Sequence, residues 1–208
     1  AFWSDIPSSK VTELFPWRPP GMDKAGVDCL QVLIDRCHHH GMQFIADIRM
    51  NDRHGGPRKG LAKEHPEWAL LGSGNDFAIQ GVRDAMLTFS SEVLDTYDVD
   101  GLEYDYMRWC HLFPPGQGAE NAHLLTDFTR KTRALLDAAG GARGEGRLKL
   151  GVRVPQTLAE CEYLGFDVPA WIRQELVYFV VPSDFFFTDL NTKVEEFVEL
   201  TAGTGCKI

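Results

Sequence analysis

The chain has 208 residues, of which 44% are hydrophobic and 25% charged, and this composition is typical of a folded globular protein rather than of a disordered tail. Its formal net charge of −9 at pH 7 argues against nucleic acid or an anionic membrane surface as a partner, because both bind basic surfaces. No run approaches the roughly 18 apolar residues that a membrane-spanning helix requires. We therefore expect one domain over residues 1–208, with no nucleic-acid partner and no membrane insertion.

The first half of the chain predicts helices and strands separated by long loops. A loop rich in Pro and Trp over 1–23 precedes a helix over 27–40, and Gly41 is suited to end that helix. The predicted elements that follow are, in chain order, a strand over 43–50, a loop over 51–77, a helix over 82–97 and a strand over 99–107.

The second half continues this alternation. Its predicted elements are, in chain order, a loop over 111–118, a helix over 119–139, a Gly-rich turn, a strand over 148–154, a loop over 155–170, a short helix near Trp171, a strand over 176–182, a helix over 192–202 and the start of a strand at 205.

Strands that alternate with helices are typical of a parallel sheet. The loops after the predicted strands are long and the turns before them are short. This asymmetry favours a (β/α)8 barrel, whose functional loops follow the carboxyl ends of its strands. Because the pattern is interrupted at both ends, we expect a central part of such a barrel, without roughly its first two strands and its last one or two.

Three of the predicted strands carry charged residues on one face and apolar residues on the other. Side chains alternate between the two faces of a strand, so Asp47 and Arg49 share one face, as do Glu103 and Asp105. Arg153 takes the corresponding face of the next strand. In a barrel this face points at the axis, where buried charges must be paired. We expect the five side chains to converge.

A carboxylate beside an arginine stays ionised, whereas a carboxyl group in a less polar setting keeps its proton, and glycoside hydrolysis uses such a pair. We expect Asp105 to be the ionised carboxylate, as a nucleophile or as a stabiliser of positive charge, and Asp184 to be the acid. Glu103 is the reserve for either carboxylate role. Asp189 is a second candidate for the acid, and an Asp at such a position also commonly caps a helix or a turn. A purely structural ion-pair cluster is the alternative, and for Asp47 alone we favour it.

The predicted rim loops carry side chains that suit a sugar. Hydrogen bonds to hydroxyl groups are expected from Asn51, Asp52 and His54, and further polar contacts from the guanidinium groups of Arg49, Arg108 and Arg153. The aromatic side chains expected to stack on sugar rings are Trp3, Trp17, Trp68, Trp109, Phe113 and Phe185. Taken singly, each of these residues has a structural alternative, either packing in the core or holding a loop.

No cofactor is expected. The five cysteines are scattered without C-x-x-C spacing, which is typical neither of a disulfide framework nor of a zinc site. The three histidines at 38–40 point in different directions on a helix, where they favour its C-terminal dipole rather than a metal. A weak alternative remains in Asp52 and His54, which together with Glu103 would form a metal site.

Several stretches carry a resemblance to a known family. They are HHHGMQFIADIRMND, HPEW, EVLDTYDVDGLEYDYMRW and LGVRVP, and the most specific of them is YDVDGLEYDYMR at 97–108. From about residue 24 onward the chain resembles the bacterial glycosyl-hydrolase-like family 10 proteins. The resemblance implies a partial (β/α)8 TIM barrel covering roughly strands 3 to 7. It also implies a carbohydrate substrate, polysaccharide degradation and a secreted or periplasmic location, although no signal peptide precedes Ala1.

Related retaining glycosidases carry an Asp nucleophile on strand 4 and an acid/base carboxylate on strand 6. By the resemblance these roles fall on Asp105 and Asp184. The leading hypothesis is therefore a glycoside hydrolase that acts on a poly- or oligosaccharide with retention. The alternatives are a non-catalytic carbohydrate-binding barrel and a metal-dependent hydrolase or lyase on the same fold. The sequence leaves the sugar, the linkage and the oligomeric state open.

Overall fold

The computed structural model describes residues 28–51, 64–70, 74–184 and 192–208. These residues form a mixed α/β fold around a four-stranded parallel sheet with the order β1-β2-β3-β4. The strands are β1 (Ile45–Arg49), β2 (Gly101–Asp105), β3 (Lys149–Val154) and β4 (Phe179–Pro182). Each of the four complete strands expected from the sequence is present, with narrower bounds.

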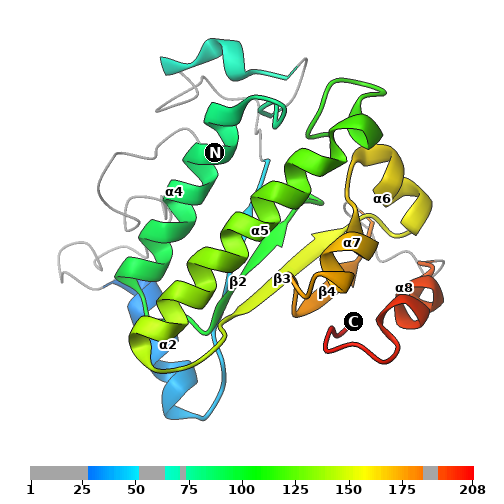
Figure 1. The fold of residues 1–208 in the computed structure, drawn as a ribbon. Coiled ribbons are helices and arrows are strands. Elements are labelled where there is room, and N and C mark those ends of the chain that lie inside the picture. Colours follow the sequence, from blue (N-terminus) through cyan, green and yellow to red (C-terminus); the bar gives the residue numbers. More distant parts are fainter. Residues whose placement is uncertain (1–27, 52–63, 71–73, 185–191) are drawn as a thin grey trace.

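Helices precede β1, connect the successive strands and follow β4. They are α2 (Cys29–His39), the 3-10 helix η3 (Pro66–Trp68), α4 (Gln80–Thr96), α5 (Gly118–Arg143), α6 (Leu158–Leu164), α7 (Val168–Arg173) and α8 (Val194–Thr201). The helices α4 and α5 lie side by side across the same face of the sheet (Figure 1). Within the described part of the chain, no helix has the length and apolar character needed to cross a membrane.

The strand order explains why the sheet has one covered and one open face. Every strand pairs with the next strand along the chain. Parallel crossovers are almost always right-handed, and in this order they carry the connecting helices to one side of the sheet. Such sequential parallel order, without reversal, is the arrangement of a barrel wall rather than of a doubly wound sheet. The fold therefore agrees with a partial (β/α) barrel, and its numbering as strands 3 to 7 stays a prediction.

The expected strand from residue 205 is present as a single bridge to β4. Lys207 pairs in parallel with Phe179, and its amide N lies 2.9 Å from the carbonyl oxygen of Tyr178. The amide of Val180 in turn donates to the carbonyl of Lys207 at 2.9 Å. The backbone after α8 thus continues the parallel order of the sheet.

Two predictions about helices were wrong. The expected loop over 155–170 contains α6, which is capped at its start by the Thr157 hydroxyl and ends at Gly165 with a φ of +92°. The expected turn after 139 is still helix, because α5 extends to Arg143. Gly140 permits this extension, since a Cβ at that position would lie 1.9 Å from the carbonyl oxygen of Gly146.

The longer α5 has a structural use, because its last residue closes the end of α4. The Arg143 guanidinium donates to the carbonyl oxygens of Leu94, Tyr97 and Val99. Carbonyls at a helix C-terminus have no partner within the helix. Arg143 therefore fastens the ends of α4 and α5 to the turn that leads into β2.

The core lies between the sheet and the helices. Its centre is Tyr104 on β2, which is fully buried and stacks against Phe128 of α5. The hydroxyl of Tyr104 lies 2.7 Å from the Ser90 hydroxyl on α4 and 3.0 Å from the Thr132 hydroxyl on α5. One phenol thus joins both covering helices to the sheet, and burial raises its pKa to about 12.

Tyr104→Phe should lower the free energy of unfolding by about 1–2 kcal/mol, because it removes a buried hydroxyl that joins two helices. The matched control is Tyr106→Phe. The Tyr106 hydroxyl is also buried and lies near Thr129, but it has no hydrogen bond of good geometry among the described residues. Urea unfolding of both variants measures the difference. Equal losses would contradict the assignment.

A second network at the amino end of the sheet makes stability depend on pH. The Asp100 carboxylate accepts hydrogen bonds from the Phe44 amide at 2.6 Å and from the His38 imidazole at 3.0 Å. The hydrogen bond with Asp100 raises the pKa of His38 above its ordinary 6.5. His38, in the last turn of α2, therefore links that helix to Asp100, which directly precedes β2.

The raised pKa of His38 means that the folded state binds the imidazolium proton more tightly than the unfolded state does. The stabilisation should be full below pH 6.5, the ordinary pKa of histidine, and should be lost as the pH rises through the raised pKa. His38→Gln should therefore lower the melting temperature at acidic pH and much less at alkaline pH. His39→Gln is the matched control. A loss for His38→Gln that is independent of pH would refute the linkage.

Candidate active site

Charged side chains gather on the open face of the sheet in two rows that run across neighbouring strands. The first row pairs Asp47 of β1 with Glu103 of β2. The second row pairs Arg49 with Asp105, and Asp105 with Arg153 of β3. Partners in register on parallel strands point to the same face. The sequence-based prediction that these five residues share one face is therefore confirmed for the described strands.

An ion pair between Asp105 and Arg153 forms the centre of the cluster. Nη1 of Arg153 lies 3.1 Å from Oδ1 and 3.2 Å from Oδ2 of Asp105. Oδ1 also accepts the Met107 amide at 2.8 Å, at the point where β2 ends. Asp105 is only 5% exposed. A carboxylate held by a guanidinium and a backbone amide is well suited to carry a fixed negative charge.

The remaining donors of Arg153 reach the end of β4. Its Nε donates to the Ser183 hydroxyl at 2.7 Å, and its Nη2 donates to the backbone carbonyl of Asp184 at 3.0 Å. The arginine thereby joins the carboxyl ends of β2, β3 and β4. Ser183 was not predicted from the sequence, and its only signal was a small polar residue directly after a strand.

The carboxyl groups of the first row are biased toward the protonated form. The pKa of Asp47 is raised to about 6, first by partial desolvation and then by the charge of Asp105, while Arg49 and Arg153 oppose the shift. The residue as a whole stays accessible to water, so the desolvation comes from neighbouring strand atoms rather than from enclosure. The sequence favours a structural role for Asp47, and its accessibility leaves a functional role open as well.

Glu103 is half-buried between the other two carboxyl groups. Desolvation raises its pKa most, followed by the charges of Asp47 and Asp105, and Arg153 acts in the opposite direction. The site thus combines one carboxylate held by an arginine with two carboxyl groups that retain protons to higher pH than usual. This is a separation of acid and base roles by environment.

The apolar side of the first row is formed by Gly151 and Phe179, which continue the register of Glu103 across β3 and β4. A Cβ at Gly151 would lie 2.0 Å from the ring of Phe179. Glycine is therefore required for the ring to lie across β3. The row that begins with Asp47 and Glu103 thus continues as an apolar surface over β3 and β4.

Asn51, expected to bind sugar hydroxyls, holds two loops together instead. It is 1% exposed, its Oδ1 accepts the Asn75 amide at 2.8 Å, and its Nδ2 donates to the carbonyl oxygens of Asn75 and His111. Gly74 leaves room for this amide, since a Cβ there would lie 2.0 Å from Oδ1. Asn51 is thus placed as a positioning residue for the rim.

Trp68 lies on the rim as expected, but part of its surface is covered. The indole stacks on His65 with ring centroids 4.0 Å apart and an interplanar angle of 6°, and it also lies against Gly81 at the start of α4. Arg108 and Trp109 are half-buried and directly follow β2. These three positions lie at the carboxyl end of the sheet, and their contact with a sugar stays a prediction.

Several predicted residues lie outside the described part of the chain. They are Asp52, His54, Trp3, Trp17, Phe185 and Asp189. Within the described residues, no group of three or more His, Cys, Asp or Glu side chains is placed to hold a metal ion. The metal site of Asp52, His54 and Glu103 therefore stays untested.

Comparisons with known proteins show only distant likenesses. No protein-family model and no curated protein matches the chain, so membership of glycosyl-hydrolase-like family 10 stays a prediction. Among solved structures, the chain is similar to a noncanonical maltogenic α-amylase, AmyB from Thermotoga neapolitana, with 18% identity and a TM-score of 0.46 over 72% of this chain and 30% of that one. A glycoside hydrolase family 18 N-acetylglucosaminidase from Paenibacillus barengoltzii has 16% identity and a TM-score of 0.45 over 73% and 39%. The chain thus spans less than half the length of either enzyme.

Substitutions of the two central residues, Asp105 and Arg153, should shift the pKa of Asp47 in opposite directions. Asp105→Asn should lower this pKa from about 6, because it removes a neighbouring negative charge. Arg153→Leu should raise the pKa values of both Asp47 and Glu103, because it removes the positive charge that opposes their shifts. Carboxyl ¹³C NMR titration measures both changes. Shifts of the same sign in the two variants would show that the charges do not couple as described.

Proposed function

We propose that the protein is a glycoside hydrolase that acts on a poly- or oligosaccharide. The observation that carries this proposal is the placement of an arginine-held carboxylate, Asp105, beside Glu103 and Asp47, whose pKa values are raised. Glycoside hydrolysis requires a carboxylate to stabilise or attack the anomeric carbon and a protonated carboxyl group to donate to the leaving oxygen.

The location of the cluster supports the same proposal. The second row lies at the carboxyl ends of β1, β2 and β3, and the rim residues Trp68, Arg108 and Trp109 follow strands of the same sheet. In (β/α) barrels this end of the sheet carries the catalytic loops. A saccharide that lies over the rim would place its anomeric carbon above β2.

We assign Asp105 as the nucleophile in a retaining mechanism and Glu103 as the leading acid. The sequence favoured Asp184 for the acid, and in the structure its backbone carbonyl accepts from Arg153. Glu103 has the raised pKa that a proton donor needs, which supports Glu103 rather than Asp184 as the general acid. Arg153 and Arg49 hold the charge balance of the cluster, and Asp47 increases the proton affinity of Glu103.

A carbohydrate-binding barrel without catalysis is the second candidate. It is favoured by the low exposure of Asp105, which leaves little of the carboxylate open to an anomeric carbon. In this case the ion pair of Asp105 and Arg153 would serve only to join the ends of three strands. The two candidates differ in whether removal of the Asp105 charge abolishes cleavage.

Wild-type protein should release reducing ends from at least one polysaccharide in a panel of neutral and charged glycans, and Asp105→Asn should abolish this release while binding is retained. Glu103→Gln should lower kcat by about 10²–10⁴-fold and remove the alkaline limb of the pH profile, because that limb reports the acid. NMR of the first anomer released distinguishes retention from inversion.

Asp95→Asn is the matched control, because Asp95 is an exposed carboxylate on α4 whose side chain contacts Ser91. The Asp95→Asn variant should cleave the polysaccharide as the wild type does. Full activity in Asp105→Asn would overturn the assignment of the nucleophile. If the wild type and all variants bind a polysaccharide but none of them cleaves it, the carbohydrate-binding barrel is favoured.

A further inference from the structure

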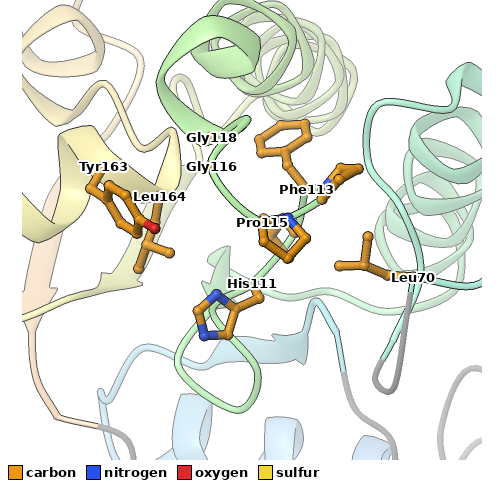
Figure 2. Close-up of a pocket in the computed structure, with 10 residues that line it drawn as sticks. Leu70, His111, Phe113, Pro115, Gly116, Gly118, Tyr163 and Leu164 are labelled. Carbon is orange, nitrogen blue, oxygen red and sulfur yellow. The ribbon is translucent and has the colours of Figure 1, made fainter.

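A pocket of about 210 Å³ lies on the carboxyl-end rim, outside the carboxyl cluster. Figure 2 shows Tyr163 and Leu164 of α6 on one side of it and Leu70 on the opposite side, with the segment from His111 to Pro115 between them. Its walls thus come from the connections after β1, β2 and β3. The function proposed above does not use this pocket.

The walls of the pocket are held in place by hydrogen bonds and close packing. The carbonyl oxygen of Leu112 accepts the Phe77 amide at 2.8 Å, and that of His111 accepts the Asn51 side chain at 3.3 Å. Gly118 lets the start of α5 approach α6, since a Cβ there would lie 2.3 Å from the carbonyl oxygen of Tyr163. A preformed pocket binds a ligand without the entropy cost of ordering its walls.

The lining is apolar with polar groups at the mouth. Its walls include Leu70, Leu112, Phe113 and Leu164, and none of the lining residues that the structure describes is Asp, Glu, Lys or Arg. The polar side chains are the exposed His111 imidazole and the hydroxyl of Tyr163, a residue that is 63% exposed. A charged ligand group would lose its hydration here without gaining a counter-charge, so the lining selects an uncharged ligand.

The volume also limits the ligand. Pockets for drug-sized ligands occupy about 300–1,000 Å³, so a smaller pocket suits a single ring. A hexopyranose has an apolar C–H face that fits the wall of Phe113 and Pro115, and hydroxyl groups that His111 and Tyr163 can bind. An aromatic ring would satisfy the wall but would leave both polar side chains without a partner in the ligand.

We propose that this pocket is a subsite for one neutral hexopyranose unit of the saccharide chain. The proposal rests on the proposed function for the identity of that chain, since both sites lie on the same rim. Asn51 links them, because it lies two residues after Arg49 at the end of β1 and donates to the His111 carbonyl in the pocket wall.

The test is an NMR titration of the full ¹⁵N-labelled protein with the methyl glycosides of glucose, galactose and mannose. At least one should shift the amide signals of Gly116 and Gly118. The charged methyl glucuronide and methyl glucosaminide should bind about tenfold more weakly, because the described lining residues offer no carboxylate, ammonium or guanidinium counter-charge. His111→Ala and Tyr163→Ala should each raise the Kd for the neutral glycoside by about fivefold to tenfold.

The matched control is Tyr178→Ala, because Tyr178 is an exposed tyrosine that directly precedes β4, at the amino end of the sheet. It should bind the neutral glycosides as wild type does. Neutral glycosides that leave Gly116 and Gly118 unshifted would overturn the subsite, as would full affinity in both pocket variants.

The two proposals fail separately. A protein that cleaves a polysaccharide while these amides stay unshifted refutes the subsite alone. A protein that binds neutral glycosides in the pocket but cleaves nothing supports the subsite and refutes the hydrolase.

Discussion

The ion pair between Asp105 and Arg153 is the interaction on which the site depends. An isolated charge on this face of the sheet would be costly, and Arg153 offsets that cost for a carboxylate that is almost fully buried. The same guanidinium reaches Ser183 and the backbone of Asp184, so that the ends of β2, β3 and β4 share one charged group. Loss of the arginine would therefore disturb both the charge balance and the shape of the rim.

The charge balance also explains why the carboxyl groups differ. Three carboxyl groups and two guanidiniums lie on the open face, so the arginines cannot compensate every negative charge. Asp105 takes the direct contact with Arg153. The pKa values of Asp47 and Glu103 are raised first by desolvation and then by the neighbouring carboxylate charges, against the opposing effect of the arginines. The difference between Asp105, which is held by an arginine, and the two carboxyl groups with raised pKa values therefore follows from burial, register and distance rather than from any unusual residue type.

Much of this arrangement could be predicted from the sequence, because it follows from local periodicity. The alternation of apolar and charged residues along 99–107 is a property of an extended strand, and it places Glu103 and Asp105 on one face wherever the strand lies. The helical spacing over 27–40 likewise predicted α2 and its end at Gly41. The prediction of a loop over 155–170 was wrong because α6 is too short for a helical periodicity to stand out in the sequence. The clear local signals of α6 are its capping residues, Thr157 at the start and Gly165 at the end.

By itself, the sequence determined which residues share a strand face, the alternation that leads to a parallel sheet, and the position of the charged rim. The tertiary structure decided which carboxyl group pairs with which arginine, since the contact of Asp105 with Arg153 joins residues 48 positions apart through strand register. It also gave Asn51 the role of joining the loops that carry Asn75 and His111. The rim pocket likewise forms only where the segments that follow β1, β2 and β3 meet. These features depend on distances between segments remote in the chain, and no local pattern encodes such distances.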